Sequence, residues 1–223
     1  MAMFPAERVR SILTRTASAH VTRLAPGPGR PTMSAVQPRV ELLTTEVVGS
    51  SEPVVVELAD PAPLPVPDRI RARVRISGHG VVPTTAGQPL LLQPTAVHLL
   101  SAGGDAAVSP VELARATPDP LTHHEGDLLS HLAHAHPQLM ETLTGLVAAH
   151  LLHGVTRVWP LELDSRGIVL RLKHGRRHHD VRLGFPTAAT CPQEALTRVR
   201  TLTALGAGRH RCRQKSRGID GPD

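Results

Sequence analysis

The sequence of 223 residues has few aromatic side chains and lacks some polar types altogether. It contains two Phe, one Trp and no Tyr, it has no Asn, and only two of its 25 basic residues are Lys. Residue types with AT-rich codons are thus scarce, which indicates a GC-rich genome. Proteins that stack single-stranded bases need aromatic platforms. The net charge of +6 is therefore weak evidence for nucleic-acid binding. We do not expect a nucleic-acid partner.

Cysteine is scarce too, and long apolar runs are missing. Cys191 and Cys212 are not part of a CxxC pair, so neither a disulfide framework nor a cysteine zinc site is expected. No apolar run of about 18 residues could span a bilayer. The N-terminal segment has arginines inside its apolar pattern, unlike a secretory signal. We expect a cytoplasmic protein without membrane contact.

The positive charge is concentrated near the C-terminus. Residues 206–223 carry five basic and two acidic side chains, a net charge of +3, which leaves +3 for the rest of the chain. The sequence predicts a basic, disordered tail over these residues. Any nucleic-acid binding would depend on this tail.

The N-terminal half alternates short β-type runs with Gly/Pro breaks, after a first helix expected over Pro5–Ala19. The breaks include a loop at 25–31 and the proline-rich connection at 61–67. Such spacing is typical of an antiparallel barrel or sandwich. The predicted strands are Val40–Val48, Val54–Leu58, Arg69–Ser77, Leu90–Gln93 and Ala96–Leu100.

The run Arg69–Ser77 has the clearest alternation, with apolar residues from Ile70 onward on one face and arginines on the other. An arginine ladder could bind the phosphate of a flavin or the propionates of a haem. It could equally be a solvated outer face, or pair with acidic residues of a neighbouring strand, and exposed charge is the commoner arrangement on half-buried sheets. The arginines are Arg69, Arg71, Arg73 and Arg75.

The C-terminal half predicts a compact α+β unit. Ser109 is a good N-cap for a short helix that extends through Ala116, and Pro137 interrupts the helical pattern that follows. The predicted helices are His123–Ala135, Gln138–His153 and Gln193–Leu205, and a meander of the strands Arg157–Asp164, Ile168–His174 and His178–Gly184 lies between the second and third of them.

Four polar side chains form a single stripe on the first of these helices, at spacings of three, four and three. They are His124, Asp127, His131 and His134. Imidazole and carboxylate groups at helical spacing can converge on one metal ion. A polar flank on a half-exposed helix explains the same stripe more simply, because short motifs match by chance.

Two further histidines have structural explanations. His136 precedes Pro137 and is expected to be a hydrogen-bonded core or capping histidine, and His150 lies in an apolar stripe and is expected to be buried. The chain contains no GxSxG, Walker or GxGxxG motif. No catalytic residue is therefore predicted.

Several segments together resemble the domain of unknown function 2470, in its short actinobacterial form. The resemblance covers Val108 to Leu205. It rests on Ala116–Leu121, Glu125, His131-Leu132, His136-Pro137, the turn Leu163–Gly167 and the strand Asp180–Pro186.

This resemblance implies a particular fold. In similar proteins the domain commonly follows a split β-barrel of the FMN-binding type, and relatives include split-barrel haem-degrading oxygenases and a plastid protein that binds glutamyl-tRNA reductase. We expect an α+β protein with an antiparallel split barrel over 1–112, a small helix-helix-three-stranded-meander-helix domain over 113–205 and the tail over 206–223. We also expect a homodimer.

The resemblance also suggests a ligand. Relatives with haem chemistry carry Asn and Asp where this chain has Ala133 and Ala135, so we expect binding of haem or a related tetrapyrrole with little or no catalysis. One alternative is a flavin-dependent oxidoreductase or haem oxygenase, with FMN or haem as cofactor. Another is a regulatory protein-interaction module. The expected ligand contacts are Arg71, Arg73, Arg75, His131 and His136.

Overall fold

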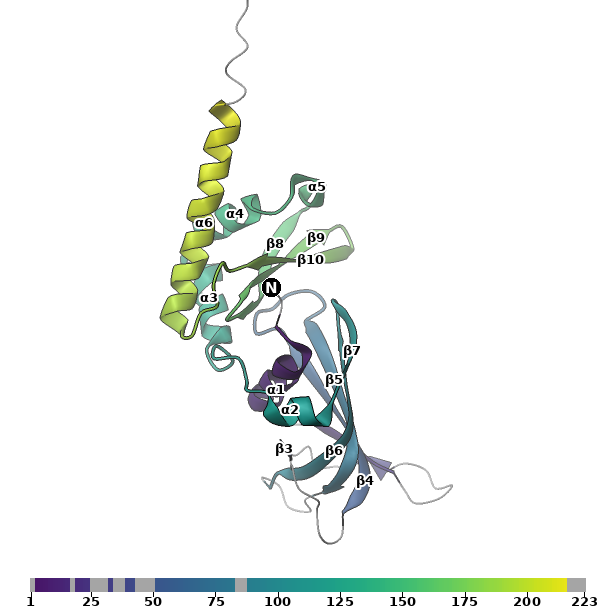
Figure 1. The fold of residues 1–223 in the computed structure, drawn as a ribbon. Helices are drawn as coiled ribbons and strands as arrows, with labels where there is room; N and C mark the ends of the chain where they lie inside the picture. Colours follow the sequence, from purple (N-terminus) through teal and green to yellow (C-terminus); the bar gives the residue numbers. More distant parts are fainter. Residues whose placement is uncertain are drawn as a thin grey trace, which may run out of the picture. The chain divides into compact units, whose positions relative to one another are not determined.

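The chain has a mixed α+β architecture and divides into two compact units. The structure is a computed structural model that describes residues 3–16, 19–24, 32–33, 39–42, 51–82 and 88–215. Residues 3–62 and 67–122 form the first unit, called here the half-barrel unit. Residues 63–66 and those from His123 onward form the second, the meander unit. Each unit has its own sheet (Figure 1).

The half-barrel unit is built on a seven-stranded sheet that curls on itself (Figure 1). The strand order is β2-β1-β4-β5-β6-β3, and β7 also pairs with β6. All pairs are antiparallel except β3 with β6. This curled, largely antiparallel sheet agrees with the expected split-barrel architecture. The strands are β1 (His20–Arg23), β2 (Thr32–Met33), β3 (Val40–Leu42), β4 (Glu52–Pro61), β5 (Ile70–Val81), β6 (Leu90–Ser101) and β7 (Gly104–Val108).

Strand β6 continues through Pro94 as one element, whereas the sequence predicted two separate runs. The pairing of β5 with β6 changes register between Ser77 and Gly78, opposite Pro94. A bulge at this point lets a proline lie in a strand although it cannot donate a hydrogen bond. A Cβ added at Gly78 would lie 2.1 Å from the carbonyl oxygen of Gln93, so the close approach of the two backbones requires glycine there.

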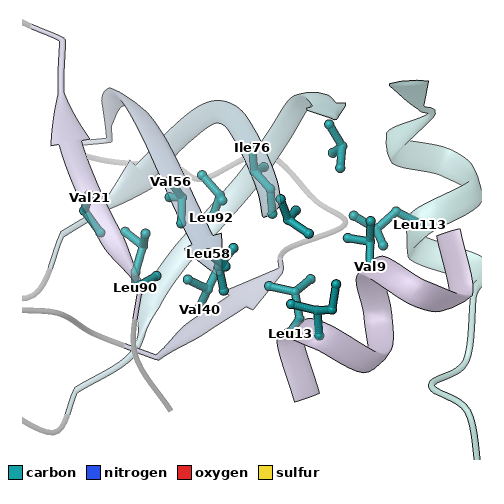
Figure 2. Packing of buried hydrophobic residues seen from close by; sticks show 14 of the residues in the cluster. Val9, Leu13, Val21, Val40, Val56, Leu58, Ile76, Leu90, Leu92 and Leu113 are labelled. Carbon is teal, nitrogen blue, oxygen red and sulfur yellow. The ribbon is translucent and has the colours of Figure 1, made fainter. Parts of the chain in front are cut away.

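Two helices, α1 (Pro5–Arg15) and α2 (Pro110–Arg115), cover one face of this sheet. Figure 2 shows Val9 of α1 beside Leu113 of α2, within the apolar core, and both side chains are fully buried. Arg10 joins the two helices, because its Nη2 donates to the carbonyl oxygen of Leu113 over 2.7 Å. Partial burial lowers the pKa of Arg10. A cation at the C-terminus of α2 also complements the helix dipole.

The meander unit has the predicted order of helices around three antiparallel strands (Figure 1). Its strands lie in the order β10-β9-β8, and α3 packs against β8 while α4 packs against α6. The apolar core includes Leu132, Leu143, Ile168, Leu170 and Leu172, all at most 1% exposed. The elements are α3 (Glu125–Ala135), α4 (Pro137–Gly145), α5 (Ala149–Leu152), β8 (Arg157–Asp164), β9 (Gly167–His174), β10 (Arg177–Gly184) and α6 (Pro192–Lys215).

A buried carboxylate fastens α3 to β8. Glu125 is 4% exposed, and its Oε1 accepts a hydrogen bond from the backbone N–H of Leu163 over 3.1 Å. The β8–β9 pairing shifts register between Pro160 and Glu162, just before this contact. A bulge leaves some backbone groups without a partner on the neighbouring strand. The carboxylate of Glu125 accepts a hydrogen bond from a backbone N–H next to this bulge. This contact gives Glu125, a residue of the resemblance motif, a structural role.

The turn after β8 is fixed by its own side chains. Asp164 Oδ1 accepts from the backbone N–H of Arg166 over 2.7 Å, and both carboxylate oxygens accept from Arg182 Nη2, at 2.5 and 2.8 Å. A Cβ on Gly167 would lie 2.4 Å from the carbonyl oxygen of Leu183. The acidic turn predicted from Leu163–Gly167 is confirmed.

Several element predictions need correction. The first helix ends at Arg15 instead of Ala19, and the helix predicted over Gln138–His153 is divided into α4 and α5. Strands β1, β2 and β7 were not predicted, because segments of two to five residues are too short to show a period of two. Helix α6 continues to Lys215, inside the segment expected to be a disordered tail.

Some predictions fall outside the described residues. These concern the loop at 25–31, the end of the run Val40–Val48 and the last eight residues of the tail. In the part of the chain that the structure describes, no helix has the length and hydropathy needed to cross a membrane.

Candidate ligand-binding site

The alternation predicted that all arginines of β5 lie on one face of the sheet. The structure places Arg71 on the other face. The side chain of Arg71 is 2% exposed, and its Nη2 lies 3.0 Å from Oδ1 of Asp60. The same oxygen lies 2.7 Å from Nη2 of Arg15. The pairing of β4 with β5 shifts register beside Asp60, which changes the facing of the side chains at this end. Ile70 is consequently 41% exposed, and the predicted face is wrong for Ile70 and Arg71.

Further along the strand, Arg73 and Arg75 are exposed and line one surface cavity of about 220 Å³. Among the described residues, neither guanidinium makes an ion pair or a hydrogen bond. Both are therefore available to an anionic ligand. The cavity is also lined by His20, Glu57, Ala59 and Leu100.

The sheet register explains why these residues meet. One cross-strand row places His20 of β1 next to Glu57 of β4, and Glu57 next to Arg75 of β5. A second row places Arg73 between Ala59 of β4 and Leu100 of β6. Directly opposed residues have their Cβ atoms about 5 Å apart. A surface of four neighbouring strands thus combines two cations, an imidazole, a carboxylate and an apolar side chain.

The chemistry of this surface suits an amphipathic anion. Residues two apart on a strand are about 7 Å apart, so Arg73 and Arg75 can each meet one of two carboxylates at the edge of a ligand. Leu100 is 40% exposed and offers apolar contact beside them. The volume lies below the roughly 300–1,000 Å³ of typical ligand pockets. The cavity can therefore hold only part of a ligand of typical size.

In the meander unit, the structure brings His131 and His136 together. His131 is exposed on α3 and His136 is half-buried at the junction of α3 and α4. Their Nε2 atoms are 3.1 Å apart, and the ring centroids are 4.8 Å apart at an interplanar angle of 84°. The predicted hydrogen bond of His136 is present, with a second histidine as its partner, but the side chain is neither in the core nor a helix cap. His136 also lines a shallow cavity of about 550 Å³ with Arg200 of α6.

The other members of the predicted metal stripe do not join this pair. His134 Nδ1 lies 2.8 Å from the carbonyl oxygen of Ser130, on its own helix. His124 and Asp127 are exposed at the start of α3. Among the described residues, no group of three or more His, Cys, Asp or Glu side chains could hold a metal ion. The four-residue stripe stays a prediction without geometric support.

Two further expectations can be compared with the structure. His150 was expected to be buried, but it is exposed on α5, because the helix break moves it off the apolar stripe. Cys191 is half-exposed and not in a disulfide. The predicted ligand contacts fall into two sets, with the arginines in the half-barrel unit and His131 and His136 in the meander unit.

His20 is the residue of this site that the sequence did not indicate. It begins a four-residue strand, and nothing in its neighbourhood predicts that strand. Its place beside Glu57 depends on the pairing of β1 with β4, between residues 37 positions apart. A histidine found only by long-range strand pairing has no local signal in sequence.

Comparison with known proteins gives a limited set of similarities. No protein-family model matches the chain. An uncharacterised protein of Arabidopsis thaliana is 30% identical over 107 residues, which are 48% of this chain and 21% of the plant protein, so the chain spans about one fifth of the length of that relative. The structure of a haem-binding protein from Mycobacterium smegmatis aligns with 93% of this chain and 99% of its own, with a TM-score of 0.59 and 15% sequence identity. The chain therefore has the fold of that haem-binding protein.

Proposed function

We propose that this protein binds haem or a related tetrapyrrole, and that Arg73 and Arg75 contact its propionates. The observation that carries the proposal is the likeness in fold, over nearly the full length of both chains, to a haem-binding protein. Proteins that share a fold often differ in function.

Three features of the half-barrel cavity support a tetrapyrrole. Arg73 and Arg75 present two cations that make no ion pair among the described residues, although Glu57 lies opposite Arg75. Guanidinium groups form paired hydrogen bonds with carboxylates. Leu100 supplies apolar contact, and His20 is a candidate axial ligand, since imidazole is a common ligand of haem iron.

The contacts differ in part from those expected from the sequence. Arg71 forms a buried ion pair with Asp60. We therefore propose only Arg73 and Arg75 as contacts of the propionates. His131 and His136, the further contacts expected from the sequence, lie in the meander unit and do not line the half-barrel cavity. Because the cavity is small, a second copy of the chain would have to cover the rest of the ring, in line with the expected homodimer.

The experiment is a titration of the purified full-length protein with haemin, followed by the Soret band and by sedimentation. We expect a Soret shift that saturates near one haem per chain. The double variant R73A/R75A should weaken binding at least about tenfold, because each charge-assisted hydrogen bond contributes about 1.5–3 kcal/mol. His20→Ala should alter the Soret maximum.

Arg39→Ala is the matched control, because Arg39 is an exposed arginine of the same unit that does not line the cavity. It should bind haemin like the wild type. A folded wild-type protein that gives no Soret shift would refute haem binding. The single variants R73A and R75A are compared with R39A. Equal losses of haemin affinity in all three would instead indicate a general charge effect.

The finer parts of the proposal concern family and turnover. We propose a haem-utilisation-like split-barrel protein with a C-terminal domain of the unknown-function 2470 type. Ala133 and Ala135 replace polar residues of similar haem enzymes, which favours binding without turnover. Ascorbate-driven loss of the Soret band would show an oxygenase, and a parallel titration with FMN tests the flavin alternative.

A second candidate function, a protein-interaction module, is favoured by one cross-strand row of the meander sheet. The row places Arg157 of β8 directly opposite Lys173 of β9. Like charges placed opposite each other destabilise a sheet, so an acidic partner segment would relieve the repulsion. Salt-sensitive binding of a protein partner that is lost in R157E/K173E would support this function, whereas unchanged binding would exclude this row.

A further inference from the structure

His131 and His136 bring two imidazole nitrogens within hydrogen-bond distance of each other. The two Nε2 atoms lie 3.1 Å apart across the junction of α3 and α4. Neutral imidazole has one donor and one acceptor nitrogen, so the pair can form a single hydrogen bond. The same two nitrogens, with their protons removed, are also metal ligands of a common type.

The distances agree with a shared metal ion. With metal–nitrogen bonds of about 2.0–2.1 Å, two nitrogens that are 3.1 Å apart subtend an angle of about 100° at the metal. An ion on the outward axis of both Nε2 atoms would then hold the ring centroids about 4.9 Å apart. The observed centroid separation is 4.8 Å. The spacing of the two rings thus agrees with that of two imidazoles on one ion.

The local structure holds the two rings in place. His131 lies on the regular helix α3, and His136 precedes Pro137 with φ −132° and ψ 58°. A residue before proline has restricted backbone angles. The two histidines are five positions apart, so they do not share a face through helical spacing alone. The break between the helices brings them together.

The charges around the pair act in opposite directions. Asp127 lies one turn before His131 on α3, where its exposed carboxylate can attract a cation. Arg200 shares the surface cavity with His136 and opposes a cation. No third protein ligand is present among the described residues. Water or another small ligand would therefore complete the coordination.

We propose that His131 and His136 form a two-histidine site for a divalent transition-metal ion that prefers imidazole, such as Cu²⁺, Ni²⁺ or Zn²⁺. Such a site has open coordination positions. It differs from the stripe predicted on α3, because it uses His136 from beyond the end of that helix. It is also independent of haem binding at the half-barrel cavity.

The test uses the full-length, haem-free protein without a polyhistidine tag. Binding of Cu²⁺, Ni²⁺ and Zn²⁺ is measured by calorimetry, and the Cu²⁺ complex by electron paramagnetic resonance. We expect Cu²⁺ to bind more tightly than Ni²⁺ or Zn²⁺, with nitrogen hyperfine structure from two imidazoles. His131→Ala and His136→Ala should each weaken the tightest site at least about tenfold, since even loss of an outer-shell partner typically costs about 10- to 100-fold.

His134→Ala and His124→Ala are the matched controls, because they remove a histidine from the same helix or its start and leave the pair intact. Both should keep the wild-type affinity and spectrum. Loss of binding in H134A or H124A would overturn the proposal in favour of the α3 stripe. Unchanged affinity in H131A and H136A, with the fold retained by circular dichroism, would also overturn it, as would a spectrum with one nitrogen ligand. Haem binding in H131A would leave the metal proposal unaffected, so the two can fail separately.

Discussion

At the scale of single residues, Asp60 is a buried carboxylate that links two elements of the half-barrel unit. It is 1% exposed, and one of its oxygens contacts both Arg15 of α1 and Arg71 of β5. Removal of one member of a buried ion pair leaves a charge without its counterion in a low-dielectric interior. The contact also connects a helix to the sheet, so its loss affects two elements.

We predict that Asp60→Ala lowers the free energy of unfolding by about 3–5 kcal/mol, the usual cost of breaking a buried pair. Urea denaturation followed by circular dichroism measures the change. Glu52→Ala breaks the Arg23–Glu52 pair, whose side chains are 38% and 40% exposed, and should cost less than about 1 kcal/mol. Similar losses in the two variants would contradict the structural role given to Asp60.

The same residues show what alternation can and cannot predict. The sequence Arg69–Ser77 indicates a strand, and β5 confirms it. The facing of Arg71 depends on a register shift against β4, which is a property of two strands that meet in space. Arg73 and Arg75 keep the predicted outward face because they lie beyond that shift.

At the scale of elements, helix α6 begins with a capping interaction that depends on pH. Glu194 Oε2 accepts hydrogen bonds from the backbone N–H of Thr190, at 2.9 Å, and from its hydroxyl, at 3.2 Å. These bonds, backbone first, lower the pKa of Glu194 below its ordinary value of 4.5, with a smaller contribution from Arg198. The ionised carboxylate is therefore the form that stabilises the helix start.

We predict that Glu194→Gln destabilises the protein at neutral pH and that the difference from wild type shrinks on acidification. A lowered folded-state pKa gives stability that is present above the unfolded-state pKa, near 4.5, and that is lost as the pH falls through the folded-state value. The urea midpoints of the variant and the wild type are measured at steps of about one pH unit between pH 3 and pH 7, and their difference gives the pH dependence. Glu141→Gln, an exposed change on α4, is the control. A constant difference at all pH values would contradict the prediction.

Element boundaries show where local signals end. Ser109 as N-cap, with Pro110 at the first helical position, predicted α2 correctly, and the structure adds Glu112 as the second half of a capping box. Pro137 correctly separated α3 from α4. The break between α4 and α5 has no proline and was missed, because the apolar stripe continues through the break. Propensity is a weak indicator where tertiary packing sets the helix end.

At the scale of the whole molecule, each compact unit has its own sheet and its own apolar core. Chains with two such units often unfold in more than one step. Asp60 belongs to the half-barrel unit and Gly167 to the meander unit. Variants of these two residues therefore report on different units.

We predict that thermal unfolding has two transitions and that each variant shifts one of them. Asp60→Ala should lower the transition of the half-barrel unit. Gly167→Ala should lower that of the meander unit, because the added Cβ would lie 2.4 Å from a carbonyl oxygen of β10. Hydrogen exchange with mass spectrometry assigns each transition to its residues. Gly145→Ala is the control, since nothing lies within 4 Å of the added Cβ. Equal shifts of all protected amides in both variants would show one cooperative unit.

The sequence alone determined the composition, the class and most elements of this protein, because hydrophobic periodicity, caps and turn residues are local signals. It also predicted the arginines of β5 and singled out His131 and His136 as candidate site residues. Only the tertiary structure decided which of these side chains meet. Strand register turned Arg71 inward and brought His20 beside Glu57, and the helix junction placed His131 next to His136. These contacts join residues on different elements, so no local pattern encodes them.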